Sequence, residues 1–85
     1  MPNIVMYCTE TCPFCMRAEN LLVKKGVQYN KILIDNNESL FQEMITKAGR
    51  DSVPQIFIDD KHIGGFDDLV ELDIDDELDP LLGIA

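Results

Sequence analysis

The sequence has no run of the ~18 to 20 consecutive apolar residues that a membrane-spanning helix requires. It also has no low-complexity segment and no internal repeat. There is no basic N-terminal region with an apolar stretch behind it, so we expect no signal peptide and a cytoplasmic protein. Its three cysteines are an odd number, which argues against a framework held by disulfides alone. With these classes excluded, the 85 residues predict one small globular domain spanning residues 1–85.

Basic residues are scarce in the last third of the sequence. Lys61 is the one basic residue of segment 59–85, which holds ten acidic residues, whereas segment 1–58 holds six of each. The net charge of -9 therefore belongs to the C-terminal segment. Such a surface repels phosphate groups, which makes nucleic acids and anionic membranes poor partners. The acidic segment is either a solvated face or a docking surface for a basic patch on a partner protein.

The spacing of apolar and turn residues predicts an alternating α/β order. Short apolar runs predict strands at 3–7, 27–35, 55–58 and 61–63. Apolar residues at helical spacing predict helices that are capped by Thr11, by Asn36 or Asn37, and by Asp67 or Asp68. The first two strands should be parallel because a helix joins them, and the last two should form a hairpin. The expected architecture is a four-stranded mixed sheet with helices on both faces, with the tail around Pro80 packed on the core.

The chemistry is concentrated in the segment Cys12-Pro13-Phe14-Cys15, at a predicted strand-to-helix junction. Two cysteines with this spacing are typical of a redox pair. Free N–H groups and the helix dipole favour a thiolate at Cys12, and Cys15 lies one turn further on, where it can attack a mixed disulfide. The alternative is a structural zinc site, but only Cys8 and His62 remain to complete four ligands, so we expect no metal.

Four motifs, in this order, resemble a dithiol glutaredoxin of the thioredoxin-like superfamily. They are Tyr7–Cys15 with Arg17-Ala18, Ser52-Val53-Pro54, Gly64-Gly65-Phe66-Asp67-Asp68, and Leu78-Asp79-Pro80-Leu81-Leu82. The resemblance covers nearly the whole chain. It implies a thioredoxin-like fold and an enzyme, a glutathione-dependent thiol–disulfide oxidoreductase. It also implies glutathione as the reductant and disulfide-containing or glutathionylated proteins, ribonucleotide reductase among them, as partners. A monomer is expected, because no long apolar face is left over.

The resemblance assigns roles to individual residues. Cys12 is the expected nucleophile and Cys15 the resolving thiol, and together they form the redox-active disulfide. The expected glutathione-binding residues are Phe14, Val53, Pro54, Gly65, Phe66 and Asp67. A cis bond before Pro54 would expose the Val53 backbone, so that the cysteinyl part of glutathione pairs with it like a short added strand. The γ-glutamyl end would meet Asp67 and the start of the last helix.

Two positions depart from the family pattern. Thr9 stands where glutaredoxins commonly have lysine, and Phe41 stands where they commonly have arginine or glutamine. Both family residues usually bind the glycine carboxylate of glutathione, and Lys47 or Arg50 could replace them. The departures leave open a redoxin that is fed by a flavin-dependent thioredoxin reductase. A further alternative is a carrier of an iron–sulfur cluster that glutathione ligates between two chains, against which Pro13 argues.

Three other residues have two interpretations each. Cys8 is expected to be a small, semi-buried hydrophobe, with a secondary oxidation site, glutathionylated or paired between chains, as the alternative. His62 is expected to be structural. Arg17 either assists the thiolate or is a solvated helix residue.

Overall fold

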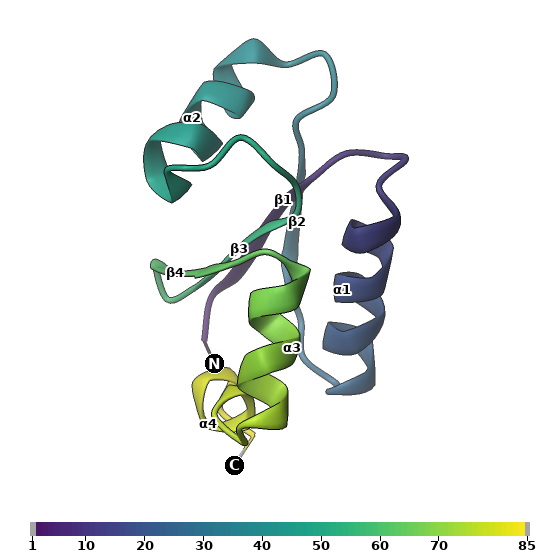
Figure 1. Cartoon of the computed structure of the whole chain (residues 1–85), viewed down its shortest axis with the longest axis vertical. Coiled ribbons are helices and arrows are strands. Elements are labelled where there is room, and N and C mark those ends of the chain that lie inside the picture. Colours follow the sequence, from purple (N-terminus) through teal and green to yellow (C-terminus); the bar gives the residue numbers. More distant parts are fainter. Residues whose placement is uncertain (1, 85) are drawn as a thin grey trace.

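The computed structural model describes residues 2–84, and its elements alternate as predicted (Figure 1). The strands are β1 (Ile4–Cys8), β2 (Asn30–Leu33), β3 (Gln55–Ile58) and β4 (Lys61–Gly64). The helices are α1 (Pro13–Lys24), α2 (Glu38–Ala48), α3 (Phe66–Ile74) and α4 (Leu78–Leu82). The strands form one mixed sheet in the order β2-β1-β3-β4, in which only β1 and β2 pair in parallel. The predicted sheet is confirmed, although β2 is shorter than the expected strand at 27–35.

The sheet is covered on both faces, and each face has its own core. On the first face α1, α3 and α4 pack over a thiol-side core whose buried members are Ile4, Met6, Cys8, Cys12, Cys15, Ala18, Leu22, Ile56, Ile58, Leu69, Leu78 and Leu82. On the opposite face α2 packs over an α2-side core whose buried members are Tyr7, Ile34, Met44 and Phe57. Successive side chains of a strand point to opposite faces, so β1 supplies Cys8 to the first core and Tyr7 to the second.

Two of the expected helix caps are wrong. The first helix begins at Pro13, so its cap is Cys12 rather than Thr11, and the Cys12 sulfur accepts the Cys15 N–H at 3.1 Å. The third helix is capped by Gly65 rather than by Asp67 or Asp68. Its Asp68 carboxylate lies inside the first turn and accepts the N–H of Gly65 at 2.9 Å. The cap of α2 is Asn37, one of the two residues expected there.

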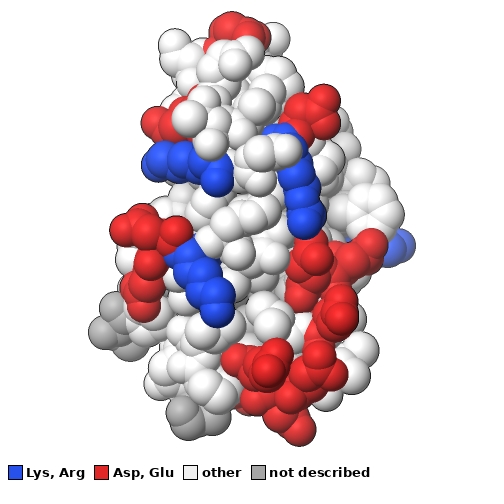
Figure 2. All heavy atoms as spheres, turned by 60° about the vertical axis from the view of Figure 1, so that its left-hand side comes forward, with Lys and Arg blue, Asp and Glu red and all other residues white. Residues whose placement is uncertain are grey.

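The C-terminal segment belongs both to the core and to the acidic surface. Leu78 and Leu82 are buried, which confirms that the tail packs on the core. Lys25, at the end of α1, pairs with Asp73 at 2.6 Å and Asp79 at 2.8 Å and so ties α1 to α3 and α4. Figure 2 shows acidic side chains gathered over the lower part of the molecule, at the height of α3 and α4. None of the helices within residues 2–84 has the length and apolar character that crossing a membrane demands.

Candidate active site

Three connections meet at one end of the sheet. β1 ends at Cys8 and leads into the two-cysteine motif. β3 runs antiparallel to β1 with Gln55 opposite Tyr7, so the segment that ends at Pro54 lies at the same end. β4 runs antiparallel to β3 and also ends there, at Gly64. The topology therefore brings together three motifs that are far apart in the sequence.

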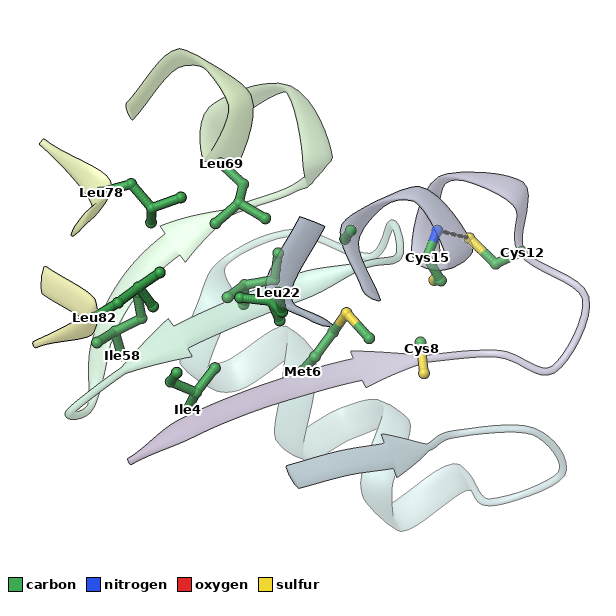
Figure 3. Packing of buried hydrophobic residues seen from close by; sticks show 12 residues of the cluster. Ile4, Met6, Cys8, Cys12, Cys15, Leu22, Ile58, Leu69, Leu78 and Leu82 are labelled. Carbon is green, nitrogen blue, oxygen red and sulfur yellow. Dashed lines mark hydrogen bonds between the residues drawn. The ribbon is translucent and has the colours of Figure 1, made fainter. Parts of the chain in front are cut away.

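Cys12 lies at the N-terminus of α1, between the helix and the loop that precedes β3. Its sulfur accepts the Cys15 N–H at 3.1 Å, and its thiol donates to the Val53 carbonyl oxygen at 3.8 Å. Figure 3 shows the first of these contacts as a dashed line. Free backbone N–H groups at the start of a helix donate to an acceptor placed there. Cys12 is 7% exposed and Cys15 is 1% exposed, so Cys12 is the more accessible thiol of the pair.

Cys15 is held inside the thiol-side core. Burial raises the pKa of the Cys15 thiol above its ordinary value, and the hydrogen bond with the Cys12 side chain raises it further. A thiol that keeps its proton is a weak nucleophile, because the thiolate is the reacting form. The two cysteines of the motif therefore differ in environment, one at the edge of the core and one within it.

A groove with a volume of about 210 Å³ opens beside Val53, whose carbonyl oxygen contacts the Cys12 thiol. The residues that line it are Phe14, Arg50, Ser52, Val53, Pro54, Gly65, Phe66, Asp67 and Asp68. All six residues expected from the sequence to bind glutathione lie in this one groove. Three further lining residues, Arg50, Ser52 and Asp68, were not among them. Ser52 and Asp68 belong to the motifs that carry the family resemblance, which is the signal that could have identified them.

Backbone geometry shapes the floor and rim of the groove. The Val53–Pro54 peptide bond is cis, as expected. Gly64 has a φ of +118°, and a Cβ at this position would overlap the Asp68 carboxylate. Only glycine is accommodated there without strain. Gly65 has a φ of -91°, and a Cβ there would be in ordinary contact, 3.5 Å from the Pro54 carbonyl oxygen.

Phe14 and Phe66 form an aromatic wall along the groove. Their ring centroids lie 6.4 Å apart and their planes are inclined by 38°. The Phe14 side chain is half exposed, so its ring is free to pack against a ligand. The Arg17 guanidinium carbon lies 5.4 Å from the centroid of the Phe14 ring, a cation–π distance. Arg17 is thus placed against the aromatic wall.

Arg50 lies at the groove, whereas Lys47 does not. The Arg50 guanidinium pairs with the Asp68 carboxylate at 3.0 Å. The Gly65 N–H and then the Arg50 guanidinium hold the pKa of the Asp68 carboxyl below its usual value. Lys47 instead donates to the Tyr7 hydroxyl at 3.4 Å, beside the α2-side core. Of the two residues that could replace the contacts missing at Thr9 and Phe41, only Arg50 lines the groove.

Cys8 and His62 lie outside the groove. Cys8 is a buried hydrophobe, and it is fully buried rather than semi-buried as expected. The His62 ring is 2.8 Å from the Gln55 side-chain oxygen and lies 5.1 Å from the Phe57 ring, centroid to centroid. Burial lowers the pKa of His62, which favours the neutral ring. Within residues 2–84, no group of three His, Cys, Asp or Glu side chains is placed to hold a metal ion.

Comparisons with known proteins agree with the fold and with the motif. The glutaredoxin family model matches residues 4–63. The chain is 54% identical over 82 residues to glutaredoxin 3 of Escherichia coli (strain K12), covering 96% of this chain and 99% of that protein. The crystal structure of a buckwheat glutaredoxin–glutathione complex matches with a TM-score of 0.89 and 29% identity, over 96% of this chain and 77% of the other. The solution structure of a Brucella melitensis glutaredoxin matches with a TM-score of 0.84 and 40% identity, over 96% and 89%. With its paired cysteines at the start of α1 and its thioredoxin-like fold, the chain belongs to the glutaredoxin family of thiol oxidoreductases.

Proposed function

We propose that the protein uses glutathione to reduce protein disulfides and glutathione mixed disulfides, with Cys12 as the nucleophile and Cys15 as the resolving thiol. The observation that carries the proposal is the position of the Cys12 sulfur, between the start of α1 and the carbonyl of Val53, a residue that lines the groove. The proposed compartment is the cytoplasm, where reducing conditions return such a pair to the dithiol form. The proposed partners are glutathione and disulfide-containing or glutathionylated proteins, with ribonucleotide reductase as one candidate, and the protein acts as a monomer without a metal.

Glutathione is proposed to lie along the groove with its sulfur beside Cys12. The Val53 backbone pairs with the cysteinyl part like a short added strand, and Pro54 fixes this segment in place. Asp67 receives the ammonium of the γ-glutamyl group, while the N–H groups at the start of α3, beside Gly65, receive its carboxylate. The buckwheat glutaredoxin matched here was solved with glutathione, which supports this choice of ligand.

Two side-chain features complete the proposed binding site. Phe14 and Phe66 form the wall that packs against the apolar part of the ligand and excludes water from the reacting sulfurs. Arg50 provides a positive charge at the groove, where Thr9 and Phe41 provide none. Arg50 pairs with Asp68, which also accepts the Gly65 N–H, so this charge lies at the end of the groove proposed for the γ-glutamyl group.

Glutathione mixed disulfides are reduced through Cys12 alone. The Cys12 thiolate attacks the glutathione sulfur, forms a Cys12–glutathione disulfide and releases the protein thiolate, which takes a proton from water. A second glutathione thiolate then attacks the glutathione sulfur of this intermediate. It forms glutathione disulfide and restores the Cys12 thiolate, so Cys15 is not needed.

Protein disulfides need both cysteines. The Cys12 thiolate attacks one sulfur of the substrate and forms a mixed disulfide, while the other substrate sulfur leaves as a thiolate. Cys15 then loses its proton, attacks Cys12 and releases the second substrate sulfur, which leaves a Cys12–Cys15 disulfide. Two glutathione molecules reduce this disulfide and become glutathione disulfide. The buried, protonated state of Cys15 keeps it from reacting before Cys12 carries a partner.

A coupled assay tests the proposal. It contains glutathione, glutathione reductase, NADPH and a small glutathione mixed disulfide, and it measures NADPH consumption by the wild type and by Cys12→Ser. We expect consumption that depends on Cys12. A folded wild type that is inactive with glutathione but active with a thioredoxin reductase would overturn the glutathione dependence. Activity that persists in Cys12→Ser would overturn the role of Cys12.

A further inference from the structure

A third thiol, that of Cys8, lies within the same core cluster as the redox pair and has no part in the reaction proposed above. Cys8 is the last residue of β1, and the alternation along the strand directs its side chain toward α1. Figure 3 shows Cys8 on β1 beneath the first turn of α1, which carries Cys15. Cys8 is 0% exposed, so an outside thiol or a second chain has no access to it in the folded protein.

The three sulfurs have an order. Cys12 caps α1, and its sulfur accepts the Cys15 N–H at 3.1 Å. Cys15, on α1, and Cys8, at the end of β1, are both buried in the core between that helix and that strand, and Figure 3 shows Cys12 on the far side of Cys15 from Cys8. Cys15 is therefore the middle member of the group. In thiol–disulfide exchange, a thiolate attacks one sulfur of a disulfide and the other sulfur leaves. Because Cys15 is the middle member, its sulfur can be attacked by Cys8 while Cys12 leaves.

We propose that Cys8 is a second disulfide partner for Cys15. The Cys8 thiolate attacks the Cys15 sulfur of the Cys12–Cys15 disulfide, forms a Cys8–Cys15 disulfide and releases Cys12 as a thiolate. One disulfide is consumed and one is formed, so no oxidant or reductant is required. The proton lost by Cys8 passes to water or to the released Cys12 thiolate. The inference rests on the proposed function, because that reaction produces the Cys12–Cys15 disulfide.

The environment of each sulfur determines the speed of this step and what drives it. Burial raises the pKa of the Cys8 thiol, so only a small fraction is thiolate at neutral pH and the exchange is slow. The leaving sulfur of Cys12 lies at the N-terminus of α1, where the Cys15 N–H is 3.1 Å from it in the dithiol protein. A leaving sulfur that accepts a backbone N–H favours the exchange.

The consequence is a change of activity in the oxidised protein. A Cys8–Cys15 disulfide leaves Cys12 free to attack glutathione mixed disulfides, which need no second cysteine. The same disulfide removes Cys15 as the resolving thiol, so the reduction of protein disulfides stops. The new disulfide lies in the core, where glutathione does not reach it as readily as it reaches Cys12. Oxidation would therefore convert a two-thiol enzyme into a one-thiol enzyme.

Disulfide mapping of the full-length protein tests the exchange. The protein is incubated with glutathione disulfide at neutral pH, quenched in acid, alkylated with N-ethylmaleimide in denaturant and cleaved after glutamate at mildly acidic pH. Cleavage at Glu10 separates Cys8 from Cys12 and Cys15, which remain together in residues 11–19. Peptide 11–19 with an internal disulfide should form first. A cross-link between peptides 1–10 and 11–19 should then accumulate, with the alkyl group on Cys12.

Two variants show how the cross-link forms. Cys12→Ser should lose it completely, because this variant has no Cys12–Cys15 disulfide to exchange. Cys8→Ala should retain the internal disulfide of peptide 11–19, and the wild-type result stands even where this core variant folds poorly.

Three outcomes would overturn the proposal. The first is a wild type in which Cys8 is recovered with the alkyl group at every time point, although the internal disulfide of peptide 11–19 has formed. The second is an equal amount of cross-link in Cys12→Ser, since it would reflect direct oxidation. The third is a cross-link with the alkyl group on Cys15, because it would pair Cys8 with Cys12. If no Cys12–Cys15 disulfide forms at any time, the two-cysteine reaction of the proposed function fails, and the exchange with it.

Discussion

The two faces of the sheet share their strands but differ in what covers them. The thiol-side core holds twelve buried residues beneath α1, α3 and α4, whereas the α2-side core holds four beneath one helix. The reactive sulfurs belong to the first face. The second face has a polar margin, where the Tyr7 hydroxyl donates to Glu43 at 2.6 Å. The difference indicates that the redox pair is set in the more extensively buried part of the molecule, where neighbouring side chains fix its geometry.

The largest expected effect separates the two cysteines of the thiol side. Cys15→Ser should lose most of its protein-disulfide reduction, because the resolving thiol is gone and only free glutathione is left to release the substrate from Cys12. Its activity on a glutathionylated peptide should persist, because a second glutathione regenerates Cys12 directly. Both activities are measured by NADPH consumption with glutathione reductase, beside Cys12→Ser, which should lose both. Equal losses of the two activities in Cys15→Ser would show that Cys15 does more than resolve.

A second prediction compares core packing on the two faces. Leu22→Ala on the thiol side should lower the free energy of unfolding by about 2–5 kcal/mol, because it leaves a cavity among fully buried neighbours. Met44→Ala, from the α2-side core, should cost less than Leu22→Ala, because fewer elements surround it and the site collapses more readily. Val23→Ala is the matched control, since Val23 is 62% exposed. Urea unfolding measures all three variants, and a larger loss of unfolding free energy in Met44→Ala than in Leu22→Ala would contradict the expected difference between the two cores.

A third prediction concerns the positive charge near the end of α2. Arg50→Ala should raise KM for a glutathione mixed disulfide about fivefold, which corresponds to about 1 kcal/mol for one exposed charged contact. Lys47→Ala is the matched control and should leave KM unchanged, because Lys47 contacts Tyr7 rather than the groove. Steady-state kinetics with the coupled assay measures both. An increase in KM for Lys47→Ala that equals the increase for Arg50→Ala would indicate long-range electrostatics instead of a contact in the groove.

The smallest expected effect tests whether the α2 side is only structural. Tyr7→Phe removes a hydroxyl that contacts Glu43 and Lys47, and it should lower the free energy of unfolding by about 0.5–1.5 kcal/mol. The value of kcat/KM should stay at the wild-type level, because the hydroxyl faces away from the thiols. Urea unfolding and the coupled assay provide the two measurements. A loss of kcat/KM at full stability would connect the α2 side to the reaction.

Much of the fold could be predicted because its signals are local. Apolar runs and turn residues indicated the strands, and Asn37 capped α2 as expected. The two-cysteine motif and the six groove residues could be predicted because they belong to the sequence motifs that resemble the glutaredoxin family. The helix cap at Gly65 could not be predicted in this way, because it depends on a carboxylate that returns from the first turn of α3.

The remaining site features depend on where the fold directs each side chain. Lys47 and Arg50 are three positions apart, yet they face different parts of the molecule. Gly49, between them, has a φ of +71° that ends α2 and redirects the chain. The proximity of Cys8 to Cys15 has a similar origin, because it arises from packing α1 on β1 rather than from their spacing. Such relations follow from tertiary structure alone.

The most direct test of this account is the order in which the three thiols react with limiting iodoacetamide in the folded, reduced protein at neutral pH. Cleavage after Glu10, followed by fragmentation of peptide 11–19, assigns the label to Cys8, Cys12 or Cys15. We predict that Cys12 is labelled first, because burial raises the pKa of both other thiols and keeps them protonated. If Cys15 or Cys8 were labelled as fast as Cys12, the result would contradict the claim that Cys12 is reactive and that the two buried thiols are unreactive.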